Sequence, residues 1–486
     1  MQISPIGFVV CAVILLTAHY CRSVLIVGLL ASVAFGSTAL VALTGLGGSS
    51  PLIYTLFSAL LITVVVLRRQ IWSDLGVVFG SMRPIWLLTT LMAYAIVGSW
   101  LLPRFFAGQT TVFVQGKTRG GVVETSLVPV GGNITQTGYF VLGGLTAIAL
   151  CILLMNRGSI RHIRTGMFVM CILHAGMGMI DLLGKLAGAG DVLEPIRTAS
   201  YAMLTEAVEG GFYRIAGAYS EASAFGARSL ACLAFVYTYW RRTNSDLAKW
   251  LAIVILMLTV LSTSSTAYVG LAILCVPVGF SISKSFLQGR IMFEDLLIVI
   301  LLCLGIVAVM AIVIRSPEFF SPFVKLLDEM VLNKASSTSG QERTYWNVKS
   351  LQSFVDTSGL GIGIGSSRAS SWLIAVISQL GVIGALLMAI LLAYIARGLG
   401  RLSAWVPSET AAIVASVRNY ALAGIVSGSL ISGTPDPGLM FFVAFAVIAA
   451  ARFHARRYRR TDMRLLASGS YIAGPPGLRP SLGHAG

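Results

Sequence analysis

Long apolar runs alternate with short polar segments along almost the whole chain. A helix that crosses the hydrocarbon core of a bilayer needs about 20 apolar residues, and the sequence contains about 13 runs that approach this length. They lie near residues 6–21, 23–45, 51–67, 84–102, 136–155, 166–186, 223–240, 248–262, 264–282, 294–315, 371–396, 411–431 and 437–453. Because several runs are short or nearly fused, we predict an all-α polytopic integral membrane protein with about 11–14 transmembrane helices, preferably 12 or 13.

Composition agrees with this fold class. The 486 residues are 56% hydrophobic and only 11% charged, which is typical of a chain that resides in lipid. No Walker loop, dinucleotide fingerprint or HExxH helix is present, and no segment has the pattern of a soluble domain. We therefore expect one multi-span membrane domain over residues 1–460, followed by a disordered cytoplasmic tail over 461–486 that is rich in Gly and Pro.

The net charge of +16 is explained by membrane topology and not by nucleic-acid binding, so no nucleic-acid partner is expected. The Lys and Arg residues cluster in alternate polar segments, near 68–69, 157–164, 241–242, 284–290, 397–401 and 456–460. Cationic segments remain in the cytoplasm, which places the C-terminus there. Three long loops then lie outside, at about 103–135, 187–222 and 316–370. An odd number of spans also places the N-terminus outside, and the lack of Lys or Arg before Arg22 argues against a cleaved signal peptide.

Cysteine and histidine give no metal site and no disulfide framework. All seven cysteines fall in or at the ends of apolar runs, where pairing or metal binding is not indicated. His174 lies inside a predicted span, and we interpret it as a packed or hydrogen-bonded helix residue and not as a catalytic one. No cofactor is predicted.

The third external loop has the pattern of two amphipathic helices on the membrane surface. The first covers residues 316–332. In the second, Tyr345, Val348, Leu351 and Val355 share one face.

The second helix is predicted to begin with a capping box formed by Ser339 and Glu342. This role competes with a catalytic role for Glu342. It also places Arg343 in the first helical turn, where the helix dipole opposes a cation, so an anion is expected nearby. Glu342 itself is one candidate for that anion.

The loop ends in the glycine run 361–365, followed by Ser366 and Arg368. Glycine allows close backbone approach to a ligand, and the next span points its N-terminus at the same place. We therefore predict that Gly363, Gly365, Ser366 and Arg368 bind a phosphate. The alternative is a flexible turn with an arginine that extends to the membrane surface.

The second loop supplies a further cation, Arg214, ahead of a predicted helix start. Ser220 is expected to cap that helix, with Glu221 in its first turn, where a carboxylate is favoured whether or not it is catalytic. Arg228 lies seven residues beyond Glu221, about 10 Å deeper along the helix. It is either a second ligand contact or half of an internal ion pair.

An ordered set of motifs resembles the O-antigen ligase and polymerase family over roughly residues 200–400. The set is Arg214 with Ser220-Glu221-Ala222-Ser223, then 261–267, then Ser339-Gly340-Gln341-Glu342-Arg343, then 361–366, and finally 379–384. Each motif is short, so the resemblance lies in their order and spacing.

The resemblance implies a bacterial inner-membrane glycosyltransferase of the GT-C kind, with its active site in the periplasm. Its donor would be a glycan on undecaprenyl diphosphate, and no metal or nucleotide would be needed. Arg214 and Arg343 match the arginines that hold the diphosphate, whereas Arg368 is a weaker counterpart. Glu221 and Glu342 are the carboxylates nearest these arginines and are candidates for the general base.

One departure from the family decides between its two activities. Ligases of the family carry a histidine shortly after the glycine run, where this chain has Arg368-Ala369-Ser370-Ser371. Its absence favours a polymerase of O-antigen or exopolysaccharide repeat units over a ligase, and leaves the general base unassigned. Membrane lipids, a chain-length regulator and other assembly proteins would then be partners. The rival readings are a flippase or transporter, for which Arg418 is a charge within a span, and a non-catalytic scaffold.

Overall fold

The computed structural model describes residues 2–21, 24–43, 49–115, 122–156, 158–200, 203–205, 208–209, 212–289, 296 and 338–467. The predicted surface helix at 316–332 lies outside these residues, as do nearly all of the predicted span at 294–315 and most of the predicted tail.

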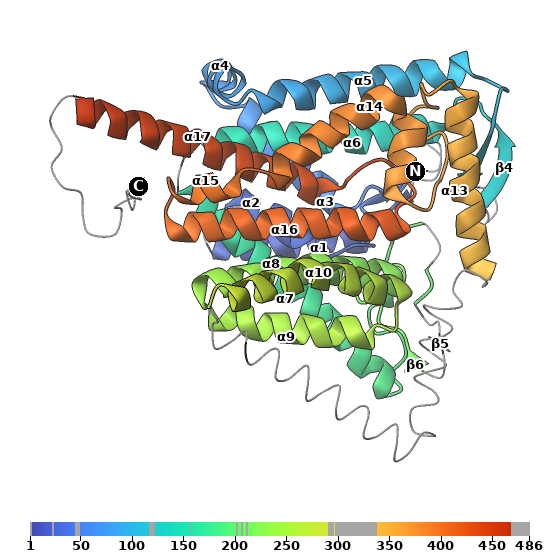
Figure 1. Cartoon of the computed structure of the whole chain (residues 1–486). Helices are drawn as coiled ribbons and strands as arrows, with labels where there is room; N and C mark the ends of the chain where they lie inside the picture. Colours follow the sequence, from blue (N-terminus) through green and yellow to red (C-terminus); the bar gives the residue numbers. More distant parts are fainter. Residues whose placement is uncertain are drawn as a thin grey trace.

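The described helices form a bundle in which most of the long helices run side by side (Figure 1). In chain order they are α1 (Pro5–Tyr20), α2 (Leu25–Ser32), α3 (Ile53–Val66), α4 (Ile71–Ser81), α5 (Pro84–Phe105), α6 (Gly131–Leu153), α7 (Ser159–Leu186), the 3-10 helix η2 (Glu194–Ile196), α8 (Ala222–Thr243), α9 (Asp246–Leu261), α10 (Ser265–Leu287), α13 (Thr338–Asp356), α14 (Trp372–Ala396), α15 (Leu399–Ser403), α16 (Ser408–Ile431) and α17 (Leu439–Ala467). Because α17 continues through Ala467, the first residues of the predicted tail are helical.

Seven of the described helices are long and apolar enough to cross a membrane: α5, α6, α7, α10, α14, α16 and α17. The pair α3 and α4, bent by 105°, would count as an eighth. Helices α1, α8 and α9 also fall on predicted spans, but α1 and α9 have only 16 residues each, and α8 carries Arg228 in its first half. The chain is thus a multi-pass, largely helical membrane protein, and the predicted 11–14 spans exceed the number that the described residues show.

The single span predicted at 23–45 is wrong. Helix α2 ends at Ser32, and the chain then turns within the bundle. The amide of Ser37 donates to the carbonyl of Ala218 at 2.9 Å, and the amide of Ala199 donates to the carbonyl of Ser37 at 3.0 Å. These bonds replace intrahelical ones, because buried backbone groups need partners wherever water is absent.

Three short antiparallel strand pairs accompany the helices, which the sequence analysis did not predict. They are β1 (Gln2–Ile3) with β2 (Val41–Ala42), β3 (Thr111–Gln115) with β4 (Val122–Ser126), and β5 (Val208–Glu209) with β6 (Phe212–Tyr213). The β3–β4 hairpin occupies the first predicted external loop and buries Val112 and Phe113.

The two ends of the bundle differ in character (Figure 1). At one end, which we call the hairpin end, α13 runs across the bundle beside β3 and β4. At the other, the basic end, lie α15 and the arginine-rich C-terminal part of α17. The predicted apolar face of α13 is 40–70% exposed at Tyr345, Val348, Leu351 and Val355, although Tyr345 also contacts Glu124 and Phe113 of the hairpin. This exposure suits a helix that lies on a membrane surface.

Helix α14 is broken at Gly381, whose φ of +66° is not helical. The break frees the carbonyls of residues 378–380, and each of them finds a partner. The amides of Ile362 and Gly363 donate to the first two carbonyls at 3.0 and 2.9 Å, and the hydroxyl of Tyr94 donates to the third at 2.9 Å. The backbone amides of the glycine run therefore satisfy carbonyls that the break in α14 leaves without intrahelical partners.

Only glycine fits the positions that make this pairing. Gly361, Gly363 and Gly365 have φ values of +84°, +83° and +80°. A Cβ atom on Gly361 would lie 2.6 Å from the amide nitrogen of Gly381, and one on Gly365 would lie 2.2 Å from a backbone carbonyl of α6. Backbone conformation and close packing both require glycine here.

Candidate functional site

The segments predicted to form the site meet at the hairpin end. The loop before α14 is fixed there to α13, because the amide of Ser370 donates to Asn347 Oδ1 at 2.9 Å. The start of α14 is fixed to the loop 432–438 between α16 and α17, since the indole of Trp372 donates to the carbonyl of Pro435 at 3.1 Å. Segments that are distant in the sequence thus converge on one corner of the bundle.

Arg368 lies at the centre of this corner. Its guanidinium carbon is 5.6 Å from the centre of the Trp346 ring on α13, and its amide donates to the carbonyl of Phe113 at 2.9 Å. Desolvation by the surrounding protein lowers the pKa of Arg368, the charge of Glu221 raises it, and the charge of Arg343 lowers it. The structure therefore places Arg343 and Glu221 within electrostatic range of Arg368. Arg368 as a whole residue is nevertheless exposed.

Helix α13 carries Arg343 half-buried and Glu342 exposed. The helix already includes Thr338, so Ser339 lies inside it and the predicted capping box with Glu342 is wrong. Within the described residues, neither Glu342 nor Arg343 forms a side-chain hydrogen bond or an ion pair. The anion predicted near Arg343 is accordingly not supplied by Glu342.

Glu221 is the N-cap residue of α8 and is half-buried. The predicted cap at Ser220 is wrong by one position, because α8 begins at Ala222. Ser220 instead pairs with the preceding loop, where its carbonyl accepts a hydrogen bond from the amide of Leu204 at 2.7 Å. The carboxylate of Glu221 does not cap the helix but accepts a hydrogen bond from Ser223 Oγ. It therefore lies at the positive end of the α8 dipole and is oriented by Ser223.

The predicted phosphate cradle of free amides is wrong. The amide of Gly363 donates to the carbonyl of Gln379, and the amide of Gly365 donates to Gln379 Oε1 at 2.8 Å. The hydroxyl of Ser366 accepts from Asn133 Nδ2 at 2.8 Å and donates to a carbonyl of its own turn. These groups position the loop, and Arg368 remains as the charged donor that it presents.

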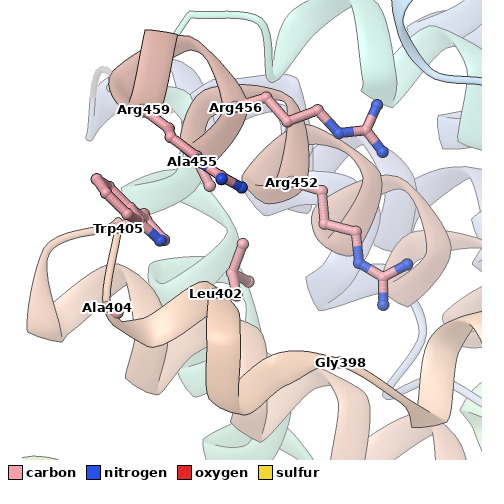
Figure 2. Close-up of a pocket in the computed structure, with 8 residues that line it drawn as sticks. All are labelled: Gly398, Leu402, Ala404, Trp405, Arg452, Ala455, Arg456 and Arg459. Atoms are coloured by element: carbon pink, nitrogen blue, oxygen red, sulfur yellow. The ribbon is translucent and has the colours of Figure 1, made fainter. Parts of the chain in front are cut away.

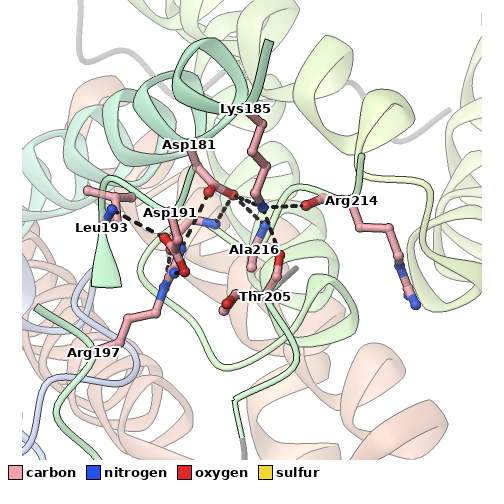
Figure 3. Close-up of polar contacts among 9 residues, drawn as sticks. Asp181, Lys185, Asp191, Leu193, Arg197, Thr205, Arg214 and Ala216 are labelled. Atoms are coloured by element: carbon pink, nitrogen blue, oxygen red, sulfur yellow. Dashed lines mark hydrogen bonds and ion pairs between the residues drawn. The ribbon is translucent and has the colours of Figure 1, made fainter. Parts of the chain in front are cut away.

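Arg214 is held at the hairpin end by buried charges. The Lys185 ammonium donates to the carbonyl of Arg214 at 2.7 Å and to that of Thr205 at 2.9 Å, and it pairs with Asp181 at 3.1 Å. Figure 3 shows the side chain of Arg214 extending away from these groups. Its backbone is thus fixed while its guanidinium points elsewhere.

The same cluster of buried charges also holds the backbone of residues 216 and 217, which follow Arg214 in the second loop. Asp181 accepts hydrogen bonds from the amides of Ala216 and Gly217 at 2.7 and 3.0 Å (Figure 3). Arg197 lies 3.5 Å from Asp181, pairs with Asp191 and donates through Nε to the carbonyl of Gly217 at 2.8 Å. Two carboxylates and two cations balance, which buried charges require.

The sequence analysis missed this cluster. Asp181 and Lys185 stand four residues apart inside a predicted span, where charged residues are expensive and usually paired. That spacing was the available signal. Arg197 and Asp191 gave none, because they lie in a polar loop.

The Arg214 guanidinium interacts electrostatically with Tyr268 in the first turn of α10. The start of α10 packs directly on the start of α8, where a Cβ atom on Gly226 would lie 2.9 Å from Ala267 Cβ. Arg214 therefore lies at the same end of the bundle as Glu221, with which α8 begins.

The turn between α9 and α10 adds an independent sign of a binding site. Thr263 has a φ of +45°, which is rare for a β-branched residue. The hydroxyls of Thr263 and Ser264 are buried and find no hydrogen-bond partner among the described residues. Strained backbone and unpaired buried polar groups both cluster at functional sites.

Arg228 is half-buried and lies two residues beyond Gly226 in α8. It donates to the hydroxyl of Tyr420 on α16 at 2.6 Å. No carboxylate pairs with it in the part of the chain that the structure describes. Of the two predicted roles, the ion pair is therefore not found, and a ligand contact stays a prediction.

The loop 432–438 contributes a carboxyl group that the sequence analysis did not identify. Asp436 is half-buried, and its Oδ1 accepts a hydrogen bond from the amide of Gly438 at 2.9 Å. Burial raises the pKa of Asp436 from 3.8 to about 6, and the bond from Gly438 lowers it by less. Asp436 thus titrates close to neutral pH.

The corner as a whole is cationic. Arg368 interacts electrostatically with one cation, Arg343, and one carboxylate, Glu221, so these three groups carry a net positive charge, and Arg214 lies at the same end of the bundle. A net positive charge of this kind favours an anionic ligand, and arginine suits a phosphate because its planar fork bonds two oxygens and keeps its charge. Among the residues that the structure describes, no three His, Cys, Asp or Glu side chains gather into a metal-binding group.

Comparisons with known proteins do not extend this picture. No family model matches the chain, and a search of curated proteins finds no significant match.

Replacing Asp181 with Asn should lower the free energy of unfolding by about 3–5 kcal/mol, since Lys185 and Arg197 would keep buried charges without their shared partner. Thermal unfolding of the purified protein in detergent measures this. The matched control is Asp74→Asn, which removes an exposed pair with Arg68 at 3.3 Å and should cost less than about 1 kcal/mol. Equal effects of the two substitutions would refute the role of the cluster.

Asp436→Asn should stabilise the protein at pH 7.5 more than at pH 5. The folded-state pKa of Asp436 is raised, so the stability contributed by its protonated form is complete below pH 3.8 and is lost as the pH rises through about 6. Asn imitates the protonated form and removes this loss. Melting temperatures at the two pH values test the prediction, with exposed Asp246→Asn as the control. A pH-independent difference between Asp436→Asn and wild type would contradict it.

Proposed function

We propose that this protein is a metal- and nucleotide-independent glycosyltransferase that polymerises undecaprenyl-diphosphate-linked repeat units into O-antigen or exopolysaccharide. In this proposal the hairpin end faces the periplasm of a bacterial inner membrane, and the architecture is of the GT-C kind. The resemblance of the ordered motifs to O-antigen ligases and polymerases supports the activity, and the alternation of arginine-rich segments supports the orientation.

The observation that carries the proposal is that Arg368 interacts electrostatically with both Arg343 and Glu221 at one corner of the bundle. The two arginines come from α13 and from the loop before α14, and they repel each other. Holding like charges together is unfavourable unless an anion occupies the site in the working protein. A diphosphate that bridges two guanidinium groups is such an anion.

The chemistry of the transfer suits this charge distribution. An acceptor hydroxyl attacks the anomeric carbon of the donor, a new C–O bond forms, and the bond from that carbon to the diphosphate oxygen breaks. Negative charge then develops on the leaving diphosphate, where preorganised arginines stabilise the transition state by several kcal/mol. In this scheme Arg214, Arg343 and Arg368 bind the diphosphate, and Glu221 takes the proton of the acceptor.

The surroundings of the corner suit a lipid-linked substrate. The exposed apolar face of α13 would lie in the membrane surface beside Arg343. The polyprenyl chain of the donor would then stay in the bilayer while its diphosphate reaches the arginines. Glu342, exposed on the same helix, is a weaker candidate for the base because no described residue orients it.

Two other activities would use a similar site. A ligase would transfer the glycan once to a different acceptor, and a flippase would move the lipid-linked unit without a reaction. The broken helix α14 is a feature found in transporters. Its free carbonyls, however, are taken by loop amides and Tyr94, so the break serves to fix the loop.

The proposal predicts that Arg343→Ala and Arg368→Ala each lower polymer formation at least tenfold, because each removes a cation that binds the leaving group, worth roughly 1.5–3 kcal/mol. The assay uses the purified protein in nanodiscs with a lipid-diphosphate-linked repeat unit, without nucleotide, and resolves products as a ladder on a gel.

Arg104→Ala is the matched control, because Arg104 is an arginine of the hairpin end that bonds a carbonyl of its own helix and stacks on Trp100. It should leave the ladder unchanged. A full ladder from the Arg343 and Arg368 variants would refute the assigned site. If the wild-type protein, reconstituted in vesicles, moved the substrate across the bilayer but never lengthened its glycan, the flippase would be favoured.

A further inference from the structure

Two cavities open at the basic end of the bundle, far from the proposed active site. Each has a volume of about 630 Å³, and Arg456 lines both of them. The first lies between α15 and α17 (Figure 2). The second lies on the other side of Arg456, toward the end of α4, and is also lined by Arg83 and Arg457.

The first cavity is basic along one wall. Arg452, Arg456 and Arg459 line it from α17 at a spacing of four and three residues, which places them on one face of the helix. Figure 2 shows the guanidinium groups of Arg452 and Arg456 extending to the same side of α17. The wall is therefore a row of cations and not a scatter of surface charge.

These cations are held in place without a carboxylate. Arg452 donates to the carbonyl of Tyr394 at 2.9 Å and lies 4.0 Å from the centre of its ring. Arg456 donates to the carbonyl of Ser81 at 3.2 Å. Within the described residues, Arg452, Arg456 and Arg459 form no ion pair. Neutral carbonyls orient two of the arginines and leave their charge uncompensated, as a site for an external anion requires.

The opposite wall is apolar. Leu402 and Trp405, from α15 and the residues after it, line the cavity on the side opposite α17, with Trp405 on the side of Arg459 (Figure 2). Arg452 is the first charged residue after the buried apolar stretch of α17, so the cavity lies where that helix leaves the hydrocarbon. Tryptophan is enriched at this depth, in the headgroup region.

We propose that the first cavity binds the headgroup of an anionic phospholipid from the leaflet at the basic end. A phosphodiester would contact Arg456 and Arg459, and its glycerol and upper acyl chain would lie against Leu402 and Trp405. Basic pockets between transmembrane helices bind such lipids on the cytoplasmic side, and the excess of arginine assigns the basic end to that side. The bound lipid would join α15 to α17. A free phosphate ion carries the same negative charge but has no apolar group to contact Leu402 and Trp405.

Native mass spectrometry of the full-length protein, purified in detergent and titrated with phosphatidylglycerol, tests the proposal. Arg456→Gln should weaken binding of the tightest lipid roughly tenfold, the usual effect of losing one charge-assisted hydrogen bond. Arg459→Gln should act in the same direction. Arg459 forms no side-chain hydrogen bond or ion pair within the described chain, so its replacement should leave the fold unaffected. Trp405→Ala should also weaken binding.

The control is Arg69→Gln, an exposed arginine of the same end that lines neither cavity. It should leave the affinity unchanged. If Arg69→Gln lowered the lipid affinity as much as Arg456→Gln, the effect would be due to the general positive charge of this end, and the proposal would be overturned. Equal affinity for phosphatidylethanolamine, or displacement of phosphatidylglycerol by inorganic phosphate at similar concentration, would also overturn it.

Discussion

The backbone hydrogen bonds between the glycine run 361–365 and the broken helix α14 are the interaction on which the hairpin end depends. A break within a membrane-spanning helix exposes carbonyls that lipid cannot satisfy. The amides of the glycine run satisfy two of them, and glycine alone allows the two backbones to approach closely enough. The pairing fixes the loop that follows, and this loop carries Arg368 to the face of α13.

A second constraint acts on the charges at the hairpin end. In the second loop, Asp181 and Asp191 balance Lys185 and Arg197, and the backbone around residues 214–217 is clamped by this neutral cluster. At the corner formed by α8, α13 and α14, Arg368 has a second cation, Arg343, and one carboxylate, Glu221, within electrostatic range, so these three groups keep a net positive charge. The contrast distinguishes charges that hold the fold from charges that remain available to a ligand.

The sequence predicted the membrane class and most helices well, because a long apolar run has few alternatives to a helix in lipid. It failed where tertiary contacts override that pattern. Residues 33–43 are apolar, yet they pair with the second loop, and nothing local signals this. The hairpin β3–β4 was missed because the alternation of Thr111 to Gln115 is too short to stand out within a predicted loop.

The candidate site was predicted in part. The structure brings Arg343, Arg368 and Glu221 together, as their shared predicted role requires. Gly363, Gly365 and Ser366 were assigned to phosphate because glycine-rich loops before helices often bind it, but here the neighbouring Gln379 takes their donors. Which amides remain free depends on long-range packing, and the spacing of residues does not contain that information. Asp436 gave no signal either, since its raised pKa results from burial in the folded protein.

The most direct test of the account is a cryo-electron microscopy structure of the protein in nanodiscs with an undecaprenyl-diphosphate-linked oligosaccharide. The account predicts density for the diphosphate between Arg343 and Arg368, within hydrogen-bond distance of both guanidinium groups and next to Glu221. Density for the diphosphate at any other place in the bundle, with Arg343 and Arg368 left unoccupied, would contradict it.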